Sequence, residues 1–158
     1  MADGLTWYFA YGSNMDPVRL FDQRLAPRGV PRGARIAGRL DGWRLVFDKP
    51  ARHLKGAAAA NIVPAGGGVV HGTLNALPDA GFAVLDICEG VADRHYERRT
   101  IGVMRGDTGE KVEAIVYVAL MQGEGLRPQR AYLECLLAGR DLLPPDYWDQ
   151  LAAMPTFD

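Results

Sequence analysis

Short apolar stretches, separated by small and polar residues, recur along most of this chain and predict a protein built mainly of strands. Several of these stretches are rich in β-branched and aromatic residues, which suit a pleated and partly buried surface. A sheet is therefore the framework that we expect. The predicted strands cover residues 7–11, 34–40, 43–47, 57–63, 69–77, 96–104 and 112–120.

Glycine-rich turns are predicted between most of these strands. Asp41-Gly42 is a favoured two-residue hairpin turn, because both of its positions take positive φ. Three consecutive glycines at 66–68 predict a second hairpin, and residues 106–109 predict a third. Residues 48–56 are expected to form a looser connection. Short turns between consecutive strands favour a mostly antiparallel sheet.

Short helices complete the pattern. Asp16 and Pro17 suit a helix start, and Val18, Phe21 and Leu25 follow at helical spacing. The strands are not separated by regular crossover helices, so we expect an α+β fold: a small, mostly antiparallel, curled or closed sheet flanked by short helices. Further helices are predicted over residues 78–90, 128–139 and 144–151.

Length and charge narrow the class of protein. The 158 residues favour one domain spanning 1–158, with room for a real core. The net charge is −1, so the basic surplus of a nucleic-acid-binding protein is missing and we expect no nucleic-acid partner. No apolar run is long enough to span a membrane, and residues 1–4 lack a signal-peptide pattern. With two cysteines and no disulfide framework, a cytoplasmic protein is expected.

Residues 8–15, Tyr-Phe-Ala-Tyr-Gly-Ser-Asn-Met, are the most informative stretch. An apolar strand breaks into a small-residue loop, and a helix start follows at once. This order places several free N–H groups together at the positive end of a helix, where they can hold an anion or a carboxylate. A well-capped turn with no ligand explains the same residues equally well.

Glu89 is the first candidate for proton chemistry. It stands where the helix over 78–90 runs out, between an apolar stretch and Gly90. Burial there would raise its pKa toward the range useful for proton transfer. An exposed glutamate at a helix end is the more common case, and the residues alone favour it.

Other chemistry is less well supported. Cys88 could be a thiol nucleophile with a histidine base, but beside an apolar helix it is better explained as a small buried hydrophobe. No set of histidine, cysteine or carboxylate residues has the spacing of a metal site. Tyr132 could equally be a core residue or a ligand contact.

Taken together, these motifs resemble those of the γ-glutamylcyclotransferase-like family. Residues 8–15 are similar to the substrate loop of that family, and Asp-Ile-Cys-Glu-Gly-Val at 86–91 is similar to the segment with its catalytic glutamate. Tyr96 follows that glutamate by seven positions, as in the animal enzymes. Pro128, Tyr132 and the apolar positions after them resemble the family's C-terminal helices, so the match runs in order over nearly the whole chain.

The resemblance implies a compact β-barrel flanked by helices and a cofactor-independent reaction. A γ-glutamyl amide cyclises to 5-oxoproline and releases an amine or an amino acid, with neither a metal nor an organic cofactor. The partner is then a small-molecule γ-glutamyl substrate, and the protein acts as a monomer or homodimer.

The resemblance also assigns roles to residues. Glu89 is the general acid and base: it accepts a proton from the substrate's α-amino group and later gives one to the leaving amine. The substrate-binding residues are Tyr11, Gly12, Ser13, Asn14, Tyr96 and Tyr132. The alternative is a non-catalytic small-molecule binding module on the same fold.

Overall fold

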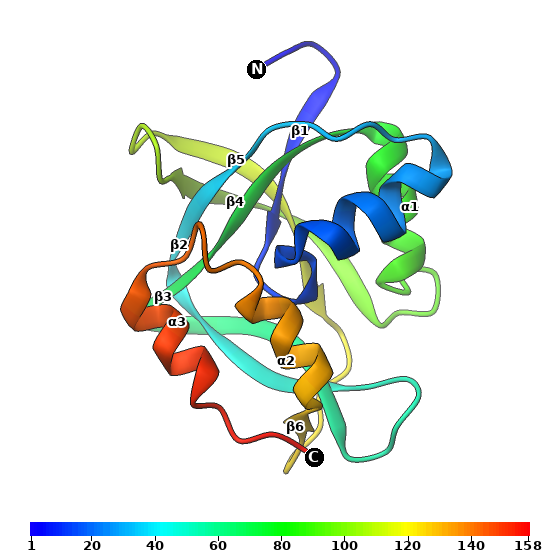
Figure 1. Cartoon of the computed structure of the whole chain (residues 1–158), viewed down its shortest axis with the longest axis vertical. Helices are drawn as coiled ribbons and strands as arrows, with labels where there is room; N and C mark the ends of the chain where they lie inside the picture. The colour runs from blue at the N-terminus through cyan, green and yellow to red at the C-terminus, as the bar shows by residue number, and fades with distance from the viewer.

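A closed barrel of five strands, extended by a short sixth, is the centre of the molecule (Figure 1). The computed structural model describes all 158 residues. Strands follow one another in the order β1-β5-β4-β2-β3-β6, and β1 also pairs with β3, which closes the ring. The pairs β1–β5 and β3–β6 are parallel and the others antiparallel, so the predicted mostly antiparallel, closed sheet is confirmed. The strands are β1 (Leu5–Ala10), β2 (Arg35–Pro50), β3 (Ala57–Pro78), β4 (Tyr96–Arg105), β5 (Lys111–Ala119) and β6 (Arg127–Pro128).

The helices pack around the outside of the barrel (Figure 1). A π-helical segment, Val18–Leu25, lies near α1 (Asp79–Cys88) on one side, and α2 (Arg130–Leu137) lies beside α3 (Pro145–Ala152) on another. Two short 3-10 turns, Ser13–Met15 and Ala26–Arg28, flank the π-helical segment. None of the helices combines the length and the apolar character that crossing a bilayer requires.

Two predicted hairpins are wrong, because β2 and β3 are each one long strand. Asp41-Gly42 and the glycines at 66–68 lie opposite each other, where the pairing of β2 with β3 shifts register. Gly42 and Gly67 do take positive φ, +84° and +76°, but they form an irregular bulge in the two strands. A left-handed glycine serves a bulge as well as a turn, so the dipeptide alone cannot distinguish the two. The true connection is the stretch 51–56, which the sequence predicts as loose.

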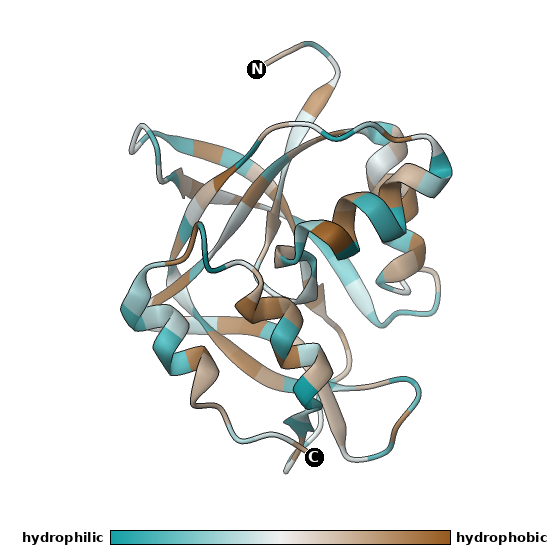
Figure 2. Cartoon of the chain, viewed as in Figure 1, coloured by the Kyte–Doolittle hydropathy of each residue, from teal (hydrophilic) through white to brown (hydrophobic).

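Alternation along β1 divides the apolar core into two parts. Trp7, Phe9 and Tyr11 point into the barrel and join buried residues from all the other long strands. Tyr8 and Ala10 face the other way and pack with the helices. Figure 2 shows apolar and polar segments alternating along both the strands and the helices.

Close contact between β1 and β3 depends on Gly72. A Cβ at this position would collide with the carbonyl oxygen of Ala10 and would press on the ring of Phe9. We expect Gly72→Ala to lower the free energy of unfolding, measured by urea denaturation, by about 1–3 kcal/mol because the two strands must move apart. Gly66→Ala is the control, since no atom lies within 4 Å of its added Cβ. Equal stability of the two variants would contradict this packing.

Candidate active site

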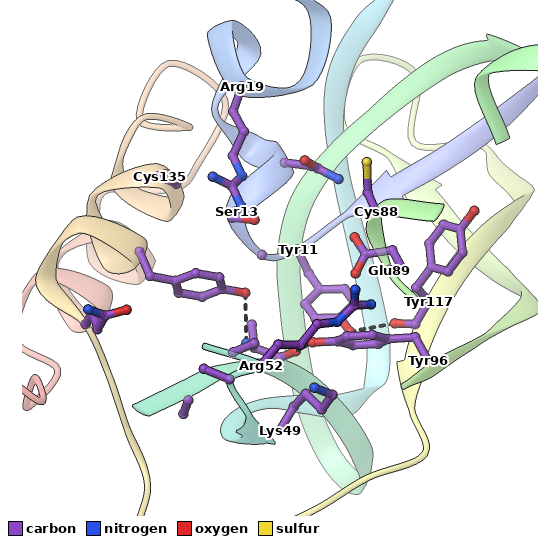
Figure 3. Close-up of a pocket in the computed structure, with 18 of the residues that line it drawn as sticks. Tyr11, Ser13, Arg19, Lys49, Arg52, Cys88, Glu89, Tyr96, Tyr117 and Cys135 are labelled. Atoms are coloured by element: carbon purple, nitrogen blue, oxygen red, sulfur yellow. Dashed lines mark hydrogen bonds between the residues drawn. The ribbon is translucent and has the colours of Figure 1, made fainter. Parts of the chain in front are cut away.

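The predicted site residues meet in one cavity of about 420 Å³ (Figure 3). Its walls come from the loop after β1, the π-helical segment, the end of β2, β3, the end of α1 and α2. Residues from both ends of the chain are therefore brought together. All the predicted site residues line the cavity: Tyr11, Gly12, Ser13, Asn14, Glu89, Tyr96 and Tyr132.

The loop at 11–14 offers free hydrogen-bond donors to this cavity. Its backbone N–H groups donate no hydrogen bond to the backbone elsewhere, whereas its carbonyls at 12 and 13 accept from the following turn. The side chain of Asn14 is fixed, because its amide donates to the hydroxyl of Tyr8 (3.0 Å) and accepts from Nη1 of Arg24 (2.8 Å). A rigid loop with unused N–H groups is a suitable cradle for a carboxylate or an oxyanion.

Glu89 lies at the C-terminal end of α1 and extends into the cavity (Figure 3). Its N–H donates to the carbonyl of Leu85 at 2.8 Å, and Gly90 then reverses the chain with φ +64°. A side chain at Gly90 would collide with Nη2 of Arg52. The glycine therefore both ends the helix and leaves room for a guanidinium next to the carboxylate.

Burial raises the pKa of Glu89, and this effect outweighs the opposing effect of the cations around it. The carboxylate is only 19% exposed, and Nη1 of Arg24 lies 3.9 Å from Oε1. Arg24 lowers the pKa most among the cations, followed by Arg19, Arg52 and Lys49. The result is a carboxylate of increased basicity that still has cations to stabilise its charged form.

Hydroxyl groups of three tyrosines are fixed by the backbone in different ways. Tyr11 donates to the carbonyl of Tyr117 (2.5 Å) and Tyr96 donates to the carbonyl of Ala60 (2.8 Å). Tyr132 instead accepts from the N–H of Ala60 (2.9 Å), so its own proton remains available to a ligand. Burial raises the pKa of Tyr132 to about 12, which keeps this hydroxyl protonated at neutral pH. Of the three, only Tyr132 keeps its hydroxyl proton for a ligand.

The basic side chains of the cavity are the part of the site that the sequence did not predict. No local pattern marks them, because each stands alone in its element and only the fold gathers them. They are Arg19 and Arg24 from the π-helical segment, Lys49 from the end of β2, and Arg52 from the following loop.

Cys88 is not the buried hydrophobe that its neighbours predict. It is partly exposed and lines the cavity beside Glu89, and Cys135 lines it from α2. Burial raises the pKa of the Cys135 thiol, which disfavours its thiolate. No group of three or more histidine, cysteine or acidic side chains is placed to share a metal ion.

Comparison with known proteins defines the family. The sequence model of the AIG2-like family matches residues 69–151, which is more than half of the chain. The chain therefore belongs to the AIG2-like family. This confirms the resemblance of its motifs to the γ-glutamylcyclotransferase-like family, which includes AIG2-like proteins. No curated protein sequence matches the chain closely enough to be informative.

Solved structures share the whole fold. A human protein described as uncharacterized protein loc79017 has a TM-score of 0.85 at 23% identity, over 99% of this chain and 91% of that one. A γ-glutamyl cyclotransferase has a TM-score of 0.80 at 23% identity, over 98% and 90%. A yeast γ-glutamyl cyclotransferase specific to glutathione has a TM-score of 0.63 at 11% identity, over 94% of each chain. At these identities the likeness establishes the γ-glutamylcyclotransferase-like fold.

Burial of Glu89 predicts how stability depends on pH. A carboxyl group whose pKa is raised by folding holds its proton more tightly in the folded state, so wild-type stability falls as pH rises from the ordinary value of 4.5 through the raised one. The variant Glu89→Gln has no proton to lose there. We expect its free energy of unfolding, relative to wild type, to increase between pH 4 and pH 8 in urea titrations. Glu97→Gln, at an exposed site on β4, is the control and should show no such trend. A difference in free energy of unfolding between Glu89→Gln and wild type that stays constant from pH 4 to pH 8 would contradict a raised pKa for Glu89.

Proposed function

We propose that this protein is a γ-glutamyl cyclotransferase, with Glu89 as the general acid and base. It would convert a γ-glutamyl amide to 5-oxoproline and release an amine or an amino acid. The observation that carries the proposal is the partly buried carboxylate of Glu89 in the same cavity as the free N–H groups of the loop at 11–14. Both line one cavity of about 420 Å³, as the reaction of a single small substrate requires.

The proposed reaction begins with proton transfer. The α-ammonium group of the substrate gives one proton to the carboxylate of Glu89, and the amine nitrogen attacks the γ-carbonyl carbon to close a five-membered ring. Glu89 passes this proton to the leaving nitrogen as the bond between that nitrogen and the γ-carbon breaks. The ring nitrogen then gives up its second proton through Glu89 to the departing amine, which leaves as an ammonium. The raised pKa of Glu89 supports both steps, since a base closer to neutral accepts and returns a proton more readily.

Positioning supports the reaction as much as proton transfer. The attack is intramolecular, so a cavity that holds the glutamyl chain folded back lowers the entropic part of the activation free energy for ring closure. In this proposal the N–H groups at 11–14 hold the α-carboxylate or the developing oxyanion, and the free hydroxyl proton of Tyr132 supplies a further donor. Tyr11 and Tyr96 shape the walls, because their protons are already given to the backbone.

The decisive test is Glu89→Gln, assayed for 5-oxoproline with a panel of γ-glutamyl amino acids and amines. Glutamine keeps the shape of the side chain but cannot act as the base, so kcat should fall by about two to four orders of magnitude. Glu97→Gln, on the exposed face of β4, should keep full activity.

Retention of wild-type turnover by Glu89→Gln would exclude the assigned role. A wild-type protein that is thermally stabilised by γ-glutamyl compounds but forms no product would instead be a binding module on this fold.

Cys88→Ala tests the competing thiol mechanism. Cys88 lines the cavity directly beside Glu89, so its position alone does not exclude nucleophilic catalysis. We expect kcat to stay within about threefold of wild type, because the proposed reaction forms no covalent enzyme intermediate. Loss of activity in a variant with an unchanged melting temperature would favour the thiol enzyme.

A further inference from the structure

The walls of the cavity carry more positive charge than the proposed chemistry requires. Glu89 is the only acidic residue among those that line it, whereas the cations Arg19, Arg24, Lys49 and Arg52 all do. Only Arg24 has an acidic partner, Glu89 itself. The Nε atom of Arg19 is buried without any hydrogen-bond partner. Unpaired cations in a partly buried cavity indicate that an anionic ligand completes it.

Lys49 gives the strongest evidence for an anionic ligand, because it is only 2% exposed. Its ammonium donates one hydrogen bond, to the carbonyl of Pro50 at 2.6 Å, and lies 5.6 Å from the ring centre of Tyr96. An ammonium has three protons to donate, so two of them have no hydrogen-bond acceptor in the protein. Burying a lysine in this state is unfavourable unless something else compensates the charge.

Arg52 lies close to Lys49, in the loop that follows β2. Burial and, after it, the charge of Arg52 lower the pKa of Lys49. Arg52 reaches toward Glu89 through the space that Gly90 leaves open, and Figure 3 shows Lys49 beneath it. Glu89 lies near both cations but forms its ion pair with Arg24, so Lys49 and Arg52 remain available to a carboxylate.

We propose that Lys49 and Arg52 hold a carboxylate of the leaving group, so that the substrates are γ-glutamyl compounds with an acidic leaving portion. This inference rests on the proposed cyclotransferase function. In the bound state the α-carboxylate of the glutamyl part contacts the loop at 11–14, and Lys49 and Arg52 remain for a second anion. Leaving groups with two carboxylates bind best, those with one bind well, and neutral or cationic amines bind poorly.

The balance of charge explains this order. With Glu89 ionised, the residues of the lining carry three more positive charges than negative ones. The glutamyl part of the substrate carries one α-carboxylate and one α-ammonium, whose charges cancel, so only carboxylates on the leaving group reduce this excess. A cationic leaving group, such as a diamine, would add to an excess that is already unfavourable in a cavity of low polarity.

A matched pair of substrates isolates the carboxylate. γ-Glutamylalanine and γ-glutamylalaninamide share the reacting amide bond and differ in whether the leaving group ends in a carboxylate or a neutral amide. We expect wild-type kcat/KM to favour γ-glutamylalanine by about 10- to 100-fold, the usual value of a hydrogen bond between charged groups. γ-Glutamylaspartate, with a second carboxylate, should be at least as good a substrate.

Substitution of the cations should remove this preference. Lys49→Met and Arg52→Gln should each reduce the ratio of the two kcat/KM values by about tenfold, mainly by slowing γ-glutamylalanine. Arg52 is exposed, so its variant remains informative if the buried Lys49→Met variant folds poorly. Lys55→Met is the control: it removes a lysine of the same loop that does not line the cavity, and it should leave the ratio unchanged.

The outcomes separate this inference from the function on which it rests. A wild-type ratio near one, or a ratio that neither variant changes, would overturn the carboxylate site while the cyclotransferase function stands. If Lys49→Met slows γ-glutamylalanine and γ-glutamylalaninamide equally, Lys49 acts only through Glu89. That result would also overturn the carboxylate site.

If no γ-glutamyl compound is converted, the proposed function fails. The same pair, titrated into wild type and Arg52→Gln by calorimetry, then decides the carboxylate site by itself. A tighter Kd for the acid in wild type alone would support the site, and equal Kd values would overturn it.

Discussion

Pairing of β1 on both of its edges is the constraint on which the rest of this structure depends. β1 joins β3 on one side and β5 on the other, so it closes the barrel and leaves no free edge. Its end at Ala10 is therefore fixed, and the loop that follows starts from a rigid point. The collision that a Cβ at Gly72 would cause shows how closely β1 and β3 approach at this end. A looser strand would leave the N–H groups at 11–14 without a defined direction.

The other walls of the cavity are connected through the backbone of Ala60 in β3. The Tyr96 hydroxyl from β4 donates to the carbonyl of Ala60, and the Tyr132 hydroxyl from α2 accepts from the N–H of Ala60. One buried residue of β3 thus positions two side chains that are far apart in sequence. The difference in hydrogen-bond direction also divides their roles, because only the Tyr132 hydroxyl keeps a free proton. Geometry of the backbone, more than the identity of the tyrosines, decides which hydroxyl can serve a ligand.

The sequence predicted most of the strands, and brought together residues that line one cavity, better than it predicted the connections. Apolar runs located β4 and β5 nearly to the residue, because burial on one face imposes the pattern directly. Asp41-Gly42 failed as a turn because positive φ is a local property, whereas a bulge or a hairpin is decided by the strand alongside. Glu89 was found through its motif, since its residue type alone favours the surface. Lys49 could not be found at all: a lysine near the end of a strand is ordinarily solvated, and only the closed fold reveals its burial.

The cations of the cavity act on Glu89 and on an anionic substrate at once, and these two effects are linked. In the free protein, Arg24, Arg19, Arg52 and Lys49 favour the ionised form of Glu89 and so oppose the effect of burial on its pKa. A bound carboxylate engages part of this positive charge and brings its own negative charge near Glu89, and both changes raise that pKa further. Under the proposed function, a carboxylate on the leaving group therefore makes Glu89 a stronger base, whereas the α-ammonium of the substrate acts in the opposite direction until it gives up its proton. In the empty cavity the cations limit the rise that burial causes in the pKa of Glu89.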